Sequence, residues 1–260
     1  VGRFSGSQAL AAVGSTTALI NVFINLFMGI SLGANVLAAR YYAAGRDREM
    51  SETVHTSIML ALISGVVMAF VGVFFAKGAL ELMDTPADVI DQSALYMRIY
   101  FMGMPFFMLY NYGAAILRAV GDTKRPLYFL IVSGVINAGL NMFLVIVFSL
   151  GVAGVAIPSL ISRAVAGFIL YHLLKNPSNE VHLLKERFHI DWPVIHKIFY
   201  IGIPSGIENG IFQLGRVIVV SIIAGFGTVQ IAANGVANSL DSMGCIVGQA
   251  MNLAMITVIG

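Results

Sequence analysis

Glu208 is the residue whose type and position most clearly suggest chemistry, because it is an acid within a long apolar stretch. It follows Ile198 by ten residues, which places it about 15 Å along a helix, near the middle of a bilayer. A carboxylate at that depth is costly unless a cation or a proton neutralises it. Glu208 is therefore a candidate for binding a cation or a cationic small molecule. The alternative is a structural ion pair with Arg216 or Arg163.

Other polar residues also lie in apolar surroundings. Asn137 and Asn141 are four residues apart and so share one face of a helix. Such a pair either belongs to a binding site or forms packing hydrogen bonds between helices. Asp241 lies in the last apolar stretch, where it either lines the same cavity as Glu208 or marks a helix end near the interface. Arg163 is expected to face the protein interior beside a structural partner.

The sequence gives no support for metal or catalytic chemistry. His182, His189 and His196 recur every seven residues, whereas helical metal ligands need a spacing of three or four. Cys245 is the single cysteine, and no GxGxxG, Walker, HExxH or GxSxG motif occurs. We therefore expect a protein that is not an enzyme and carries no metal or cofactor.

The elements that must position these residues are membrane helices. Of the 260 residues, 58% are hydrophobic and only 11% are charged, whereas soluble domains have about 25% charged residues. The net charge of +2 is too small to indicate nucleic-acid binding. The composition predicts an all-α integral membrane protein, a polytopic helical bundle that contacts membrane lipid.

Charge-free runs divide the chain into membrane-length segments, since a spanning helix needs about 20 apolar residues. A long run from Pro126 is expected to split at Gly151 and Gly154. We predict seven segments at residues 12–39, 54–77, 93–118, 126–149, 153–174, 198–223 and 231–260. Basic residues concentrate in alternate connections, which predicts that 40–52, 118–125 and 175–197 are cytoplasmic.

The connection 175–197 is the longest polar stretch and separates five segments from two. It predicts a first unit at 1–174, a cytoplasmic linker, and the start of a second unit at 198–260. Asp191, Trp192 and Pro193 are typical of a helix start. The chain begins without Met and its last segment has no basic flank, so we expect the interior of a longer protein.

Glycines at regular spacing predict close contacts between helices. Gly202, Gly206 and Gly210 recur every four residues beside Pro204. Gly29 and Gly33 form a similar ridge in the first segment. Small residues at this spacing let the backbones of neighbouring helices approach each other closely.

Several motifs resemble those of the multidrug and toxic compound extrusion (MATE) family. The most specific is LRAVGDTKRP at residues 117–126, which is similar to the cytoplasmic turn Arg-Ala-x-Gly-Asp-Thr-Lys-x-Pro of that family. Supporting matches are VGR at 1–3, LAA at 10–12, the turn at 151–157, GIP at 202–204 and IAAN at 231–234. They occur in family order over nearly the whole chain.

The resemblance implies a fold and a function. Family members have about twelve helices in two six-helix lobes, so this chain would hold the second to the eighth helix. They are monomeric, multi-pass proteins of the cell membrane. A gradient of Na+ or H+ drives their export of bulky, often cationic or aromatic compounds. The chain is therefore expected to belong to a secondary active multidrug exporter, with Na+ or H+ as the coupling cation.

The resemblance also assigns roles to particular residues. Family members often carry a polar pair, near a cation site, at the positions that match Asn137 and Asn141. Ser159 matches a family threonine on the next helix. These three residues are expected to bind the cation or the substrate. Some relatives place an acid where this chain has Phe212. Glu208 lies one turn earlier, so its role carries over only approximately.

Three alternatives remain on the sequence alone. A lipid-linked sugar flippase of the same superfamily would share the topology, although its cavity would need several basic residues for a pyrophosphate. An integral membrane enzyme would need clustered catalytic groups at a membrane boundary. A remnant that does not transport is chemically indistinguishable from an exporter.

Overall fold

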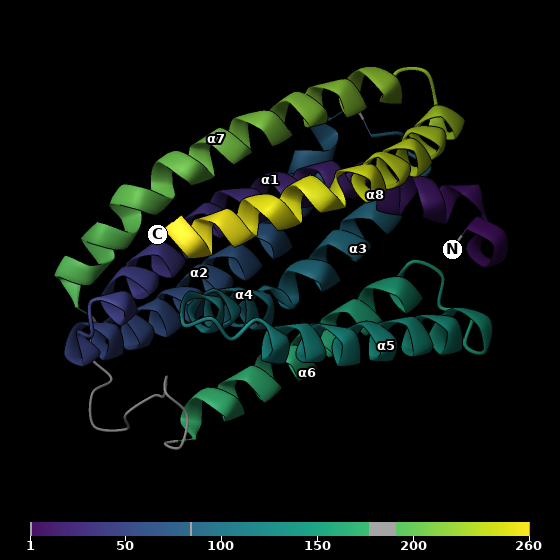
Figure 1. Cartoon of the computed structure of the whole chain (residues 1–260). Coiled ribbons are helices and arrows are strands. Elements are labelled where there is room, and N and C mark those ends of the chain that lie inside the picture. The colour runs from purple at the N-terminus through teal and green to yellow at the C-terminus, as the bar shows by residue number, and fades with distance from the viewer. Residues whose placement is uncertain (1, 84, 177–190, 260) are drawn as a thin grey trace.

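The computed structural model describes residues 2–83, 85–176 and 191–259 (Figure 1). Most of the expected linker, including His182 and His189, lies outside these ranges. Within them all regular structure is helical, which confirms the all-α class. The helices are α1 (Gly2–Ala43), α2 (Asp47–Glu81), α3 (Ile90–Met102), α4 (Met104–Ala119), α5 (Lys124–Ile146), α6 (Ala153–Lys175), α7 (Trp192–Ala224) and α8 (Thr228–Ile259).

Five of the described helices are long and apolar enough to cross a bilayer, namely α1, α2, α5, α6 and α7. The last expected segment forms α8, which has 32 residues. It carries the polar residues Asn234, Asn238 and Asp241. The membrane class predicted from composition is thus confirmed by the helices themselves.

The expected segment 93–118 is helical but not one continuous helix, because the chain breaks at Gly103 into α3 and α4. Pro105 stands in the first turn of α4, where its missing N–H and its ring prevent a continuous helix. The Gly103 N–H instead donates to the Tyr100 carbonyl at 3.1 Å, and the Phe107 N–H donates to the Gly103 carbonyl at 3.1 Å. Neither half alone has the length of a spanning helix.

Glycines at positive φ form the turns on either side of α5. Gly151, at φ +56°, lies between α5 and α6 and confirms the predicted split of the long apolar run. Gly121, at φ +84°, reverses the chain between α4 and α5. The Asp122 carboxylate then accepts the Arg125 backbone N–H at 3.2 Å and pairs with the Arg125 guanidinium at 3.3 Å. The motif at 117–126 is therefore a compact turn that begins α5.

The buried core lies mainly among α1, α2, α3, α4 and α6. Phe101, Met108 and Tyr112 are fully buried there. The opposite face of α2 presents Phe70 and Phe74, which are 60% and 66% exposed. Phe70 and Phe74 thus belong to an exposed apolar surface on a helix long enough to cross a bilayer.

The two glycine ridges meet each other, because α1 and α7 lie side by side (Figure 1). A Cβ added at Gly29 would overlap the Gly206 backbone, and one added at Gly202 would lie 2.6 Å from Ile30 Cα. This confirms the close approach predicted for Gly29, Gly202 and Gly206. A Cβ at Gly210 would meet no described atom within 4 Å, so Gly210 takes no part in the contact.

Candidate functional site

The structure brings Asn137, Asn141 and Ser159 together between α5 and α6. Asn141 Nδ2 donates to Asn137 Oδ1 at 2.6 Å, as their spacing of four residues predicts. Asn137 Nδ2 donates across the interface to Ser159 Oγ at 3.3 Å and to Ser162 Oγ at 3.1 Å. We call these four side chains the amide–hydroxyl cluster.

Ser162 also belongs to this cluster, although it is not among the residues predicted from the sequence. Its hydroxyl donates to the Ser159 carbonyl at 3.1 Å, and its own carbonyl accepts the Ser133 hydroxyl of α5 at 2.8 Å. Ser162 follows Ser159 by three residues, so the helical repeat could have placed both on one face. The hydrogen bonds of Ser162 to Ser133 and to Asn137 therefore join α5 to α6.

One oxygen of the cluster is not satisfied by the described residues. Asn141 Oδ1 is buried and has no hydrogen-bond partner among the described residues. A buried acceptor without a partner is unfavourable by about 1–3 kcal/mol. Amide and hydroxyl oxygens are ligands that hard cations accept. The cluster contains no carboxylate, so it offers neutral oxygens rather than a titrating acid.

Glu208 lies on α7, away from the amide–hydroxyl cluster. Its side chain is exposed, and among the described residues no ion pair or hydrogen bond reaches its carboxylate. At about 100° per residue it lies roughly 200° around α7 from Gly206, on the side opposite α1. The alternative, an ion pair with Arg216 or Arg163, is not formed among the described residues, since Arg216 pairs with Asp241 and Arg163 lies over an aromatic ring.

Asp241 pairs with Arg216 across α7 and α8. Their charged groups are 3.2 Å apart, and the side chains are 58% and 37% exposed. Arg216 lines a cavity of about 260 Å³ between α1, α7 and α8, whose lining includes Gln213 and Asn238 but neither Asp241 nor Glu208. The two acids therefore do not share this cavity. Asp241 lies well inside α8 rather than at a helix end.

Arg163 faces the interior of the helix bundle, as expected, but its partners are aromatic. Its guanidinium carbon lies 3.8 Å from the centre of the Tyr100 ring and 4.5 Å from the centre of the Phe107 ring. A cation over an aromatic face is attracted by the ring quadrupole. Arg163 passes beside the break at Gly103, where an added Cβ would lie 3.6 Å from Arg163 Cδ, an ordinary contact distance.

The chain matches known proteins over most of its length. The family model described as MatE matches residues 1–143. "Probable multidrug resistance protein YoeA" of Bacillus subtilis (strain 168) is 33% identical over 249 residues, which are 93% of this chain and 54% of that protein. "Probable multidrug resistance protein NorM" of Thermotoga maritima is 26% identical over 263 residues, 97% of this chain and 55% of that protein.

Solved structures have the same fold. The structure of the MATE multidrug transporter DinF-BH in complex with R6G superposes with a TM-score of 0.92 at 17% identity, over 100% of this chain and 58% of that one. The chain spans about half the length of the curated relatives it matches. With a family model that covers more than half of its residues, the chain belongs to the MatE family, the multidrug and toxic compound extrusion transporters.

Proposed function

We propose that the protein carrying this chain is a secondary active exporter that exchanges small organic compounds for Na+ or H+ across the cell membrane. Relatives of this chain bear the names of multidrug resistance and multidrug export proteins. The neighbouring structure of DinF-BH was solved with R6G, a cationic aromatic dye. Both findings support small cationic or aromatic substrates.

The observation that carries the proposal is the buried Asn141 Oδ1 without a partner in the amide–hydroxyl cluster. In the proposed mechanism a cation interacts with this oxygen, with Asn137 and with the Ser159 hydroxyl. Cation binding then favours one arrangement of α5 against α6. Glu208 supplies the negative charge of the second unit, where it binds the coupling cation or the cationic substrate.

Replacing Asn141 by alanine is expected to raise the cation concentration that gives half-maximal export at least tenfold. Hydrogen bonds to charged groups contribute about 1.5–3 kcal/mol, and about 1.4 kcal/mol corresponds to tenfold in affinity. The measurement is R6G efflux from cells that express the full-length protein, over a range of Na+ concentrations and of external pH.

Asn111 provides the matched control. It is a half-buried asparagine of α4 whose Nδ2 donates to the carbonyl of its own helix at Phe107, at 2.7 Å. Asn111→Ala should leave the cation dependence unchanged. Equal cation dependence for Asn141→Ala and the unaltered protein, at equal expression, would remove the cluster from the mechanism.

A further inference from the structure

A basic cavity lies where the end of α1, the start of α2 and the start of α7 meet. Its volume is about 820 Å³, within the range of small-molecule sites. Arg40, Arg46, His196 and Lys197 are among its lining residues. None of the described residues that line it is an acid. It belongs neither to the amide–hydroxyl cluster nor to the cavity beside Arg216.

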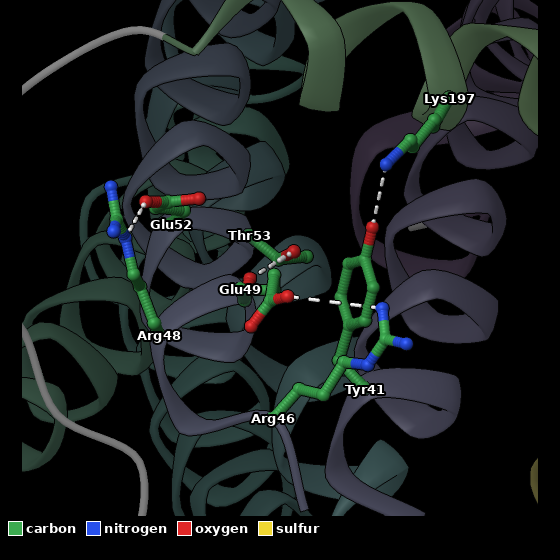
Figure 2. Close-up of polar contacts among 7 residues, drawn as sticks. All are labelled: Tyr41, Arg46, Arg48, Glu49, Glu52, Thr53 and Lys197. Atoms are coloured by element: carbon green, nitrogen blue, oxygen red, sulfur yellow. Dashed lines mark hydrogen bonds and ion pairs between the residues drawn. The ribbon is translucent and has the colours of Figure 1, made fainter. Parts of the chain in front are cut away.

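The cations of this cavity are only weakly neutralised. Lys197 Nζ donates to the Tyr41 hydroxyl at 2.9 Å, a contact with a neutral group (Figure 2). Arg46 reaches Glu49 at 3.8 Å, with 61% of its side chain exposed. Arg40 makes no ion pair with any described residue. Three basic side chains therefore line one space, and among the described residues only Arg46 has a carboxylate partner.

The cavity also has an apolar side and a position at a membrane boundary. Leu37 and Ile201 line it together with Tyr41 and Tyr200. Trp192, at the first position of α7, is 75% exposed, and tryptophan is enriched where a membrane meets water. The sequence predicts this side to be cytoplasmic, and cytoplasmic leaflets are rich in anionic lipid.

We propose that this cavity binds the headgroup of an anionic phospholipid. The phosphate lies among Arg40, Arg46 and Lys197, while the glycerol and upper acyl chain contact Leu37 and Ile201. Basic pockets between helices at this face of a membrane suit such headgroups. Because α1 and α7 both contribute, the bound lipid holds together the two helices that meet at the glycine ridges. Lipid binding is independent of the proposed export activity.

The test is the thermal stability of the purified full-length protein in detergent, titrated with dioleoylphosphatidylglycerol, dioleoylphosphatidylcholine or inorganic phosphate. Phosphatidylglycerol should raise the melting temperature at the lowest concentration. The double variant Arg40→Gln/Lys197→Gln should need at least about tenfold more phosphatidylglycerol for the same shift, since each basic residue adds to the attraction. The variant Arg40→Lys/Lys197→Arg should keep the response.

The control variant removes one arginine charge and one lysine charge from residues outside the cavity. Arg48 points away from it and pairs with Glu52 at 3.0 Å (Figure 2), and Lys124 is an exposed residue at the start of α5. Arg48→Gln/Lys124→Gln should respond like the unaltered protein. If the first double variant does not fold, the single Arg40→Gln serves in its place.

Three outcomes overturn the inference. Equal stabilisation by phosphatidylcholine would mean that headgroup charge is not recognised. Equal stabilisation by inorganic phosphate would mean that the site takes a free anion rather than a lipid. Equal losses in the cavity and control variants would mean that general surface charge, not the cavity, attracts the lipid.

Discussion

Replacing Gly206 by alanine is expected to lower the stability of the full-length protein by about 1–3 kcal/mol, the usual effect of overpacking. The added Cβ would lie 2.5 Å from the Leu26 carbonyl oxygen of α1. A backbone oxygen cannot rotate away as a side chain can, so α1 and α7 must separate. The measurement is the melting temperature in detergent, which should fall by several degrees.

Gly210 is the matched control, one turn further along the same helix. A Cβ there meets no described atom within 4 Å, so Gly210→Ala adds no clash. Alanine is favoured over glycine inside a helix by about 0.5–1 kcal/mol, so this variant should be unchanged or slightly more stable. Equal melting temperatures for the two variants would contradict the close contact between α1 and α7.

Replacing Glu208 by glutamine is expected to reduce gradient-driven R6G export at least tenfold, a loss of about 1.4 kcal/mol or more. Glutamine has nearly the same shape but neither carries a charge nor exchanges a proton. No arginine or lysine among the described residues neutralises Glu208, which leaves its carboxylate for a cation or a proton in the proposed mechanism. The rate should be measured at equal amounts of protein in the membrane.

Glu81→Gln makes the same chemical change at the exposed end of α2 and should leave export unaffected. Substrate binding without a gradient separates two roles for Glu208. If Glu208 binds the cation, Glu208→Gln keeps R6G binding and loses the gradient dependence. If Glu208 binds the substrate, R6G binding itself weakens. Export at the full rate would remove Glu208 from the mechanism.

Much of the fold follows from local sequence signals. Charge-free runs predicted the long helices, and Gly151 marks the turn that divides α5 from α6. The break at Gly103 was missed, although a glycine two residues before Pro105 is itself a local signal for a helix end. An apolar run of membrane length masks such a break, because hydropathy does not depend on backbone continuity.

The ion pairs were harder to predict than the helices. Glu208 and Arg216 are eight residues apart on one helix, a rise of about 12 Å, which is too far for a direct pair. Arg216 instead meets Asp241 at 3.2 Å, because α8 returns alongside α7. Such a pair depends on how two helices lie against each other, which the spacing within one helix does not specify.

The candidate sites also combine contacts that spacing along one helix predicts with contacts that depend on how helices pack. The contact between Asn137 and Asn141 follows from a spacing of four residues, whereas the bonds to Ser159 and Ser162 depend on the packing of α6. The basic cavity joins Arg40 to Lys197 from segments more than 150 residues apart in the chain. The glycine ridges hold these segments together, and no local pattern indicates which helix each ridge meets.

The most direct test of cation-driven export uses the full-length protein in liposomes. R6G accumulation is followed with an imposed Na+ gradient, with an imposed pH gradient, and with each gradient collapsed by an ionophore. We predict that one of the two gradients accelerates dye accumulation and that its ionophore abolishes the acceleration. Dye movement at the same rate with and without both gradients would contradict secondary active export.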